Sequence, residues 1–324
     1  MRIFVTGGAG FIGSHFVRTL LAEGYPGLEN SRVCVLDSLT YAGNRANLPP
    51  DGERLAFVRG DITDLEVLHS LLPGHDAIVH FAAESHVDRS VRLRGGSAFV
   101  RTNVLGTQSL LEAALHTGVT TFLHVSTDEV YGSIDEGSWT EEHLLEPNSP
   151  YAASKASSDL LARAYHRTHG LDVRITRCPN NYGPHQHVEK LVPHFVTRLL
   201  RGLDVPLYGD GGNVREWLHV DDHCRALAAV LTRGTPGRIY NIGGGTELTN
   251  RELTGMLLEL CGADESSIRH VEDRKGHDRR YSTDDTRIRT ELGYAPRWSF
   301  PEGLARTVAW YRDHPQWWKP LVAS

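Results

Sequence analysis

Short apolar runs alternate with longer amphipathic segments through the first half of the chain. The runs are rich in Val, Ile and Phe and do not alternate strictly with polar residues, which is typical of strands buried on both faces of a sheet. Strands separated by helices indicate βαβ units and a parallel sheet. The predicted strands are residues 2–6, 32–37, 56–59, 77–80, 121–126, 173–177 and 238–242.

The intervening segments have helical periodicity at residues 13–23, 65–72, 99–117 and 151–168. From residue 180 to 217, and again from residue 247 onward, loops, prolines and polar residues dominate. We therefore predict an α/β fold, a Rossmann-type doubly wound parallel sheet with a smaller mixed α/β substrate lobe. The domain that contains the large sheet would comprise residues 1–178 and 218–245, and the smaller lobe residues 179–217 and 246–324.

A chain of 324 residues is long enough to bury the cores of both lobes. Its net charge of −6 gives no electrostatic reason to expect a nucleic-acid or membrane partner. No stretch approaches the ~18 apolar residues of a membrane helix. The first apolar run begins at Ile3, which leaves no room for a signal peptide, so we expect a cytoplasmic protein.

A glycine-rich segment, Thr6-Gly7-Gly8-Ala9-Gly10-Phe11-Ile12-Gly13, follows the first predicted strand and opens a helix. Glycines there permit a tight turn and let backbone N–H groups approach a pyrophosphate at the positive end of the helix. Asp37 ends the second strand, where a carboxylate can bind both ribose hydroxyls and would repel a 2′-phosphate. The pattern favours NAD over NADP, although Asp37 could instead cap a turn.

Asp61 and Ile62 follow the third strand and would lie beside the adenine of a dinucleotide. A helix N-cap is an equally good interpretation of Asp61.

Tyr151 and Lys155 are four residues apart on a predicted helix, so they share one face. A free tyrosine, with a pKa of about 10, is a poor base at neutral pH. A neighbouring ammonium and the positive nicotinamide ring would both favour the phenolate, which makes Tyr151 a candidate base. The alternative is a solvated helix face.

Thr127, Asp128 and Glu129 follow the apolar run 122–125 and would emerge at the carboxyl end of a central strand, where ligands of open α/β sheets bind. Thr127 can hydrogen-bond a hydroxyl that is being oxidised. Two adjacent carboxyls supply a base for a C–H bond and an acid for a leaving hydroxyl. The plainer interpretation is an Asp cap beside an exposed Glu.

Over nearly its whole length, the chain resembles the dTDP-glucose 4,6-dehydratases among the extended short-chain dehydrogenases/reductases. The Thr-Asp-Glu triplet and the Arg-Lys-Gly-His-Asp segment at 274–278 are the most selective of the matching motifs. Without the resemblance, residues 274–280 would be taken for a solvated charge run. The matching segments are the glycine loop and residues 36–44, 80–90, 126–132, 151–155, 180–184, 189–191, 208–211, 215–217 and 273–281.

The resemblance implies that Tyr151, with Lys155, takes the C4 hydroxyl proton of a nucleotide-linked glucose while NAD is reduced. Glu129 would then remove the C5 proton and Asp128 would protonate the departing C6 hydroxyl. NAD would be regenerated in each turnover and held tightly. The product would be a 4-keto-6-deoxy sugar for deoxysugar biosynthesis, and the protein would be a homodimer.

The resemblance also implies two sets of binding residues. The expected NAD site consists of Gly7, Gly10, Phe11, Ile12, Gly13, Asp37, Ser38, Leu39, Thr40, Asp61, Ile62, Phe81, Ala82, Ala83, Ser85, Thr102, Tyr151, Lys155 and Asn181. The expected dTDP-glucose site consists of Ser85, His86, Thr127, Asp128, Glu129, Asn180, Lys190, Leu191, Pro206, Tyr208, Arg215, Asn250, Arg274, His277 and Tyr281. Arg215 and Arg274 are the candidates for the substrate pyrophosphate.

Two segments depart from the family pattern. Residues 91–96 are longer and richer in glycine than is usual, and His187 and Val188 stand where an aromatic residue and a proline are common. The 18 histidines show no metal-ligand spacing such as HExxH, so we expect no metal.

Other functions share many of these features. A nucleotide-sugar 4-epimerase would share the fold, NAD and the Tyr/Lys pair but would not need two carboxyls after Thr127. A dehydratase of another nucleotide sugar would share all of them. A non-catalytic NAD-sensing regulator could use the same fold.

Overall fold

The computed structural model describes residues 1–91, 96–273 and 276–322. Its centre is a seven-stranded sheet in which every pair of neighbours is parallel. In order across the sheet, the strands are β10 (Ile239–Asn241), β6 (Asp172–Cys178), β5 (Thr121–Thr127), β4 (Ala77–His80), β1 (Arg2–Thr6), β2 (Arg32–Asp37) and β3 (Leu55–Arg59). All seven predicted strands are present, and their ends differ from the prediction by at most one residue. The Rossmann-type fold is confirmed.

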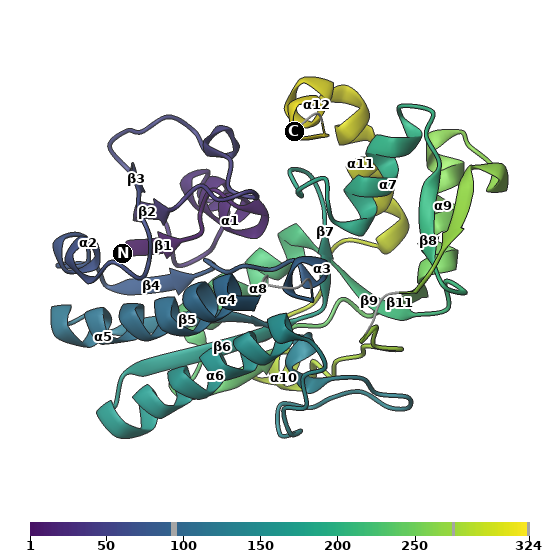
Figure 1. Ribbon diagram of the computed structural model, residues 1–324. Coiled ribbons are helices and arrows are strands. Elements are labelled where there is room, and N and C mark those ends of the chain that lie inside the picture. Colours follow the sequence, from purple (N-terminus) through teal and green to yellow (C-terminus); the bar gives the residue numbers. More distant parts are fainter. Residues whose placement is uncertain (92–95, 274–275, 323–324) are drawn as a thin grey trace.

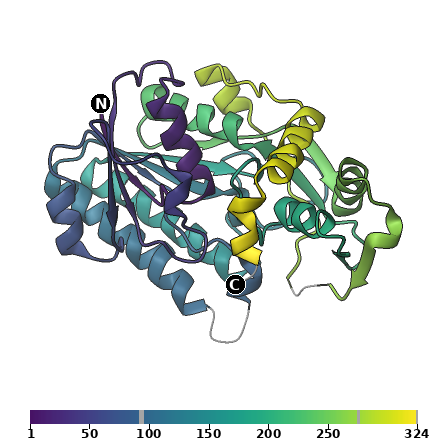
Figure 2. The same cartoon turned by 90° about the horizontal axis from the view of Figure 1, so that it is seen from above.

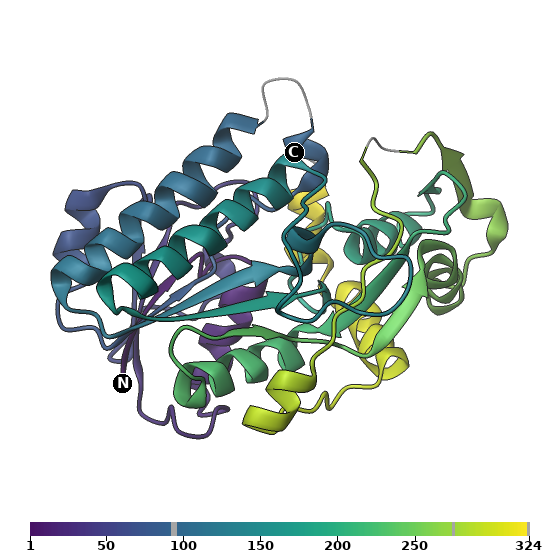
Figure 3. The same ribbon diagram turned by 90° about the horizontal axis from the view of Figure 1, so that it is seen from below.

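Helices cover both faces of this sheet (Figures 1 and 3). A hydrophobic core lies on each face of the sheet. Successive side chains of a strand point to opposite faces, so Ile3 and Val5 of β1 enter one core and Phe4 enters the other. The helices on the first face are α1 (Phe11–Leu21), α8 (Val220–Arg233) and α10 (Thr286–Leu292). Those on the second face are α2 (Leu65–Leu71), α5 (Thr107–Thr117) and α6 (Pro150–His169).

The predicted helix 99–117 consists of three consecutive segments, of which the middle one is π-helical. It starts as the α-helix α4 (Gly96–Phe99), passes through a π-helical segment, η2 (Val100–Gly106), and continues as the α-helix α5. Shorter elements connect the rest of this lobe. These are α3 (Val87–Ser90) and the 3₁₀ turns η1 (Arg45–Asn47) and η3 (Asp128–Tyr131).

The second lobe has its own core and two small sheets, to the right in Figure 1. Trp318 is buried in this core, and Trp310 and Trp317 pack against it. The strands are β7 (Asn180–Tyr182), β9 (Val214–His219) and β11 (Thr246–Thr249) in one sheet, and β8 (Val205–Tyr208) and β12 (Ile268–Val271) in the other. The helices are α7 (Leu191–Leu199), α9 (Asn250–Cys261), η4 (Glu265–Ser267), α11 (Phe300–Asp313) and α12 (Pro315–Val322).

The chain crosses between the lobes more often than the predicted boundaries imply. Ile288 and Leu292 of α10 belong to the core under α1 and α8, although they lie in the later excursion of the chain. Helix α12 reaches the first lobe, where the Trp317 Nε1 donates a hydrogen bond to Asn47 Oδ1 at 2.8 Å (Figure 2). The division at residues 178, 218 and 245 stays a prediction. Across the described ranges, no helix has the length and apolar character needed to cross a membrane.

Candidate active site

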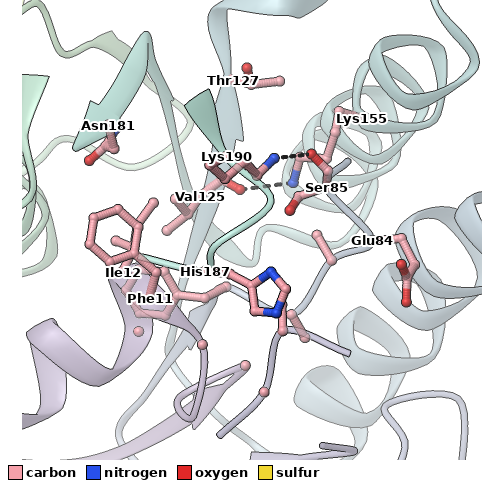
Figure 4. Close-up of a pocket in the computed structure, with 18 of the residues that line it drawn as sticks. Phe11, Ile12, Glu84, Ser85, Val125, Thr127, Lys155, Asn181, His187 and Lys190 are labelled. Carbon is pink, nitrogen blue, oxygen red and sulfur yellow. Dashed lines mark hydrogen bonds between the residues drawn. The ribbon is translucent and has the colours of Figure 1, made fainter. Parts of the chain in front are cut away.

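A cavity of about 380 Å³ lies where the carboxyl ends of the sheet strands meet the second lobe. Its walls include residues that directly follow or end five of the parallel strands: Gly7 after β1, Asp37 on β2, Phe81 after β4, Thr127 on β5 and Cys178 on β6. The strand order reverses at β1, and the crevice at such a point is where open α/β sheets bind ligands. Figure 4 shows side chains from both lobes directed into this cavity.

The glycine loop has no room for side chains at two positions. A Cβ on Gly7 would lie 2.6 Å from Ala82 N, and Gly7 has a positive φ of 69°. A Cβ on Gly13 would lie 2.4 Å from the Gly7 carbonyl oxygen. Gly10 is the N-cap of α1, so the free N–H groups of the first helical turn face the cavity. This loop fits a dinucleotide pyrophosphate.

Asp37 organises the turn beside this loop. Its Oδ2 accepts a hydrogen bond from Ala9 N at 2.9 Å, and its Oδ1 accepts one from Leu39 N at 2.8 Å. Burial raises the pKa of the carboxyl, and these two N–H groups oppose the shift. Asp37 therefore caps a turn and lines the cavity at once.

Asp61 also lines the cavity, but it does not cap a helix. The N-cap of α2 is Asp64, whose Oδ1 accepts hydrogen bonds from Glu66 N and Val67 N. Asp61 instead accepts a hydrogen bond from Thr63 N at 2.9 Å in the turn that precedes α2. The helix-cap interpretation of Asp61 was wrong, because the helix starts three residues later than that interpretation requires.

Tyr151 and Lys155 lie in the first turns of α6, one turn apart and both buried. The helix is set by Ser149, whose hydroxyl accepts a hydrogen bond from Ala152 N, and by Pro150 at its first position. The Lys155 ammonium donates a hydrogen bond to Val125 O at 2.8 Å (Figure 4). Burial lowers the pKa of Lys155 to about 8.

The protein's own groups do not make Tyr151 a strong base. Burial and the nearby Glu129 carboxyl raise the pKa of its phenol well above the usual value, and a hydrogen bond with Thr127 opposes this. A base at neutral pH therefore needs added positive charge beside the phenol. That Lys155 and a bound nicotinamide supply this charge stays a prediction.

The carboxyl pair lies in a tight turn at the end of β5. Thr127 is the N-cap of η3, and its hydroxyl accepts a hydrogen bond from Glu129 N at 3.2 Å and donates one to Asp128 Oδ1 at 3.2 Å. Asp128 is only 1% exposed. Burial and the nearby Glu129 and Glu216 carboxyls raise its pKa well above the ordinary range. The side chain of Asp128 therefore holds a proton that it can donate.

Most of the predicted site residues line this one cavity. Of the NAD set, only Leu39 is missing from the walls; it packs against the hydrophobic core instead. The NAD-site residues in the walls are Gly7, Gly10, Phe11, Ile12, Gly13, Asp37, Ser38, Thr40, Asp61, Ile62, Phe81, Ala82, Ala83, Ser85, Thr102, Tyr151, Lys155 and Asn181. The substrate-site residues in the walls are Ser85, Thr127, Asp128, Glu129, Asn180, Lys190 and Leu191.

The other predicted substrate residues that the structure describes are not among the residues that line the cavity. His86 Nε2 lies 3.5 Å from the cavity residue Glu189. Arg215 on β9 stacks over the ring of Tyr281 at 4.2 Å; Arg215 opposes the rise in the pKa of Asp128, and burial together with the Glu129 carboxyl raises the pKa of Tyr281. The remaining residues of this group are Pro206 and Tyr208 on β8, Asn250 at the start of α9, and His277, whose Nδ1 lies 2.6 Å from Asp273. Their roles, like those of the cavity residues, stay predictions.

Two predictions fall outside the described residues. Arg274, a candidate for the substrate pyrophosphate, is one, and residues 92–95 of the glycine-rich departure are the other.

Several cavity residues were not predicted as part of the site. Glu84 follows β4 closely and could have been found from its position at a strand end. His187, noted only as a departure from the family pattern, also lines the cavity. Gln186, Glu189 and Trp217 come from the second lobe, and no spacing rule connects them to the glycine loop.

Several polar atoms in the cavity walls are available to a polar ligand. Among the described residues, Asp128 Oδ2, Trp217 Nε1 and Gln186 Oε1 are buried in the cavity walls without a hydrogen-bond partner. Asn250 Oδ1 in the second lobe is also buried without a hydrogen-bond partner. Buried polar atoms are nearly always hydrogen-bonded, so a ligand in the cavity would gain partners in Asp128, Trp217 and Gln186. By contrast, no group of three His, Cys, Asp or Glu side chains in the described ranges could hold a metal ion.

Comparison with known proteins gives a consistent result. Residues 4–307 match the family described as GDP-mannose 4,6 dehydratase. The chain is 62% identical over 322 residues to a dTDP-glucose 4,6-dehydratase of Streptomyces antibioticus, with 99% of this chain and 95% of the relative covered. It is 61% identical over 325 residues to that of Streptomyces griseus, with 100% of this chain and 98% of the relative covered.

Solved structures agree with the sequence comparisons. A crystal structure of DesIV (dTDP-glucose 4,6-dehydratase) from Streptomyces venezuelae with NAD and TYD bound superposes with a TM-score of 0.97 at 68% identity, covering 99% of this chain and 100% of DesIV. The UDP-glucose 4-epimerase of Thermotoga maritima with UDP-glucose reaches a TM-score of 0.88 at 34% identity, covering 97% of this chain and 100% of the epimerase. The fold is thus shared with epimerases, while the sequence is much closer to the dehydratases.

Proposed function

Because this chain belongs to the dTDP-glucose 4,6-dehydratase family, we propose that it is an NAD-dependent hydro-lyase that converts dTDP-glucose to dTDP-4-keto-6-deoxyglucose and water. The observation that carries the proposal is the pair of adjacent carboxyls, Asp128 and Glu129, in one cavity with Tyr151 and Lys155. An oxidation at C4 needs only the tyrosine and the lysine. Loss of water across C5 and C6 also needs a base and an acid.

NAD fits the cavity, since the glycine loop admits a pyrophosphate and Asp37 stands at the end of β2. When bound, NAD supplies the oxidant for C4 and the reductant for C6, so the dehydration is redox-neutral and the cofactor is kept. The structure of DesIV was determined with NAD bound, as was that of a dTDP-glucose 4,6-dehydratase from Bacillus anthracis, which shares 45% identity with this chain. We infer that this protein retains its NAD between turnovers.

Side chains of the protein accept and donate the protons of the reaction. The Tyr151 phenol oxygen accepts the proton of the C4 hydroxyl, and the Thr127 hydroxyl orients that group. Oxidation at C4 acidifies the C5–H bond, and Glu129 removes that proton. Asp128, which burial keeps protonated, gives its proton to the departing C6 hydroxyl, which leaves as water. A proton returned to C5 completes the product.

The rival functions are less well supported. A 4-epimerase has no use for a protonated Asp128 beside Glu129, and the identity to the epimerase of Thermotoga maritima is 34% against 68% to DesIV. A non-catalytic NAD sensor would not need Tyr151 and Lys155 in the same cavity as the carboxyls. Among nucleotide sugars, dTDP-glucose is favoured because the relatives at about 60% identity are named for it. We place the enzyme in the cytoplasm and in deoxysugar biosynthesis.

Incubation with dTDP-glucose tests the proposal directly. The purified protein, without added NAD, should form a 4-keto product detected by its absorbance in alkali. Tyr151→Phe should lower the rate by about 10²–10⁴-fold, since a proton-transfer group is commonly worth that much. UDP-glucose serves as the matched substrate control. The proposal would be wrong if dTDP-glucose were epimerised at C4 without loss of water, or if neither nucleotide sugar reacted.

A further inference from the structure

A buried charged cluster lies beneath Lys155, outside the cavity. Asp159 follows Lys155 by one turn on α6, which places the two side chains on the same face of the helix. Asp159 is fully buried, and a carboxylate in that position is costly unless it is paired and hydrogen-bonded. Its partners are Arg177, whose Nε donates to Asp159 Oδ2 at 2.8 Å, and His124, whose Nε2 lies 3.3 Å from Asp159 Oδ1.

Arg177 is itself fixed by further buried groups. It is the largest fully buried side chain of the described residues. Its NH1 donates a hydrogen bond to the Tyr131 hydroxyl at 2.7 Å, and that hydroxyl donates to Asn241 Oδ1 at 2.9 Å. Tyr131 ends the same turn that carries Asp128 and Glu129. The cluster therefore links the Lys155 side of the site to the carboxyl turn.

The surroundings of Asp159 favour its ionised form. Burial alone would raise its pKa, but Arg177 and the nearby His124 outweigh burial and lower it. His124 is neutral near pH 7, because burial and the nearby Lys155 lower its pKa to about 4. Asp159 and Arg177 thus form the charged pair, while His124 Nε2 lies 3.3 Å from Asp159 Oδ1 and hydrogen-bonds the Ser158 hydroxyl at 3.1 Å.

Lys155 is surrounded by groups that differ in their effect on its charge. Asp159 on its own helix and Cys178 on β6 favour the ammonium. His80 on β4 and His124 on β5 also interact with it, and both are held neutral by burial and by Lys155 itself. Burial raises the pKa of the Cys178 thiol, so this group is neutral as well. Of these neighbours, Asp159 is the one that carries a full negative charge at neutral pH.

We propose that Asp159, fixed by Arg177 and His124, is a positioning residue that keeps the Lys155 side chain in its ammonium form beside Tyr151. The inference rests on the proposed function, in which that ammonium supports the phenolate during C4 oxidation. A neutral amine could still hydrogen-bond Val125 O but would give the phenolate no electrostatic support. The ordinary alternative is a structural ion pair that only stabilises the fold.

The pH dependence of C4 oxidation distinguishes a positioning role of Asp159 from a purely structural ion pair. Without Asp159, Lys155 would lose its proton at lower pH, so the alkaline limit of activity should move down by about one pH unit in Asp159→Asn. At a pH above the alkaline limit, the rate of the variant would be about tenfold lower than that of the wild type. The measurement is reduction of bound NAD after mixing with dTDP-glucose, followed from pH 6 to 9. Asp159→Glu keeps the charge and should largely restore the wild-type limit.

Asp222→Asn is the matched control. Asp222 is also a buried carboxylate, on α8, and accepts hydrogen bonds from Arg297 N at 2.8 Å and Trp298 N at 3.0 Å, outside the cavity walls. Its loss should lower the melting temperature without moving the pH limit. If Asp159→Asn lowered the melting temperature in the same way and left the pH limit in place, Asp159 would be structural and the proposal would be overturned.

A second variant covers the case in which Asp159→Asn does not fold, because it leaves Arg177 buried without its partner. Asp159→Asn combined with Arg177→Gln removes both charges, a change that proteins often tolerate. The alkaline limit should fall in this double variant too, and an unchanged limit would again overturn the proposal. A wild-type protein that produced no 4-keto sugar would instead refute the proposed function.

Discussion

Asp128 and Glu129 are adjacent in the chain, but their surroundings give them different chemistry. Asp128 is buried next to two other carboxyls, and this raises its pKa well above the ordinary range. Glu129 is only partly buried and lines the cavity. Two like groups in unlike environments are a common way to supply one acid and one base. The residue-scale expectation is that Asp128 donates a proton and Glu129 accepts one.

Their isosteric amides should therefore fail at different steps. Glu129→Gln should still oxidise C4 but should exchange little solvent deuterium into C5, because the amide cannot take the C5 proton. Asp128→Asn should also oxidise C4 and should keep C5 exchange, while water loss slows by about 10²–10⁴-fold. Reduction of NAD and mass spectrometry of the sugar measure these steps separately.

The reverse pattern, with C5 exchange normal in Glu129→Gln and lost in Asp128→Asn, would require the two roles to be swapped. Near-native dehydration by both variants would remove the argument for a dehydratase from the carboxyl pair.

At the scale of elements, the turn between β1 and α1 depends on a missing side chain. Gly13→Ala would place a Cβ 2.4 Å from the Gly7 carbonyl oxygen. Overpacking of this kind costs about 1–3 kcal/mol, which corresponds to roughly ten- to hundredfold weaker NAD binding. The NAD content of the purified protein should fall accordingly, measured by chromatography of the released nucleotide.

Gly255→Ala is the control for this change. Gly255 lies within α9, and a Cβ there would meet nothing within 4 Å. It should raise the free energy of unfolding by about 1 kcal/mol, because alanine favours a helix over glycine. NAD content should stay at the wild-type level. Loss of NAD in both variants would show that the effect is not specific to the glycine loop.

The strands were the most predictable elements. Helices cover both faces of the sheet, so all the side chains in a run such as Ile3 to Val5 are apolar. The hydrophobic pattern alone therefore located the ends of the strands to within one residue. The glycine loop, Asp37 and the residues after β5 were predictable for a related reason. Ligands of such sheets bind at the carboxyl ends of strands, and these residues follow strands directly in sequence.

Other features depend on contacts that a local pattern does not contain. The π-helical segment Val100–Gly106 lies inside a run that was predicted as one helix, because apolar spacing over so short a stretch does not distinguish a π turn from an α turn. The start of α2 at residue 65 was predicted correctly, but the role of Asp61 was left open between adenine contact and helix cap, and the structure shows that Asp64 is the cap. Gln186 and Glu189 reach the cavity only through packing of the second lobe on the first.

At the scale of the whole molecule, the two lobes are held together at several places around the cavity. Lys190 Nζ in the second lobe donates a hydrogen bond to Ser85 O in the first at 2.7 Å (Figure 4). Trp317 of α12 contacts Asn47, and α10 packs beneath the large sheet. A substrate that spans the lobes therefore enters a cavity whose two walls are already connected.

The outer side of the helical layer formed by η2, α5 and α6 carries exposed apolar side chains. Val100 is 58% exposed and Leu105 is 50% exposed, both in η2, and Leu160 on α6 is 54% exposed. The segment η2 contacts α6, so these side chains belong to one layer, which Figure 3 shows with nothing packed on its outer side. Large apolar side chains gathered on one face indicate an interface.

We therefore expect a homodimer that pairs this layer with its copy across a two-fold axis. Sedimentation should give a particle of about twice the 36.0 kDa chain mass at micromolar concentration. Leu160→Glu should shift it toward the monomer, because it would bury an unpaired carboxylate at the centre of the interface. Leu203→Glu, at a 41% exposed leucine in the second lobe, is the control and should leave the dimer intact. A wild-type monomer, or a dimer unaffected by Leu160→Glu, would show that η2 and α6 do not form the interface.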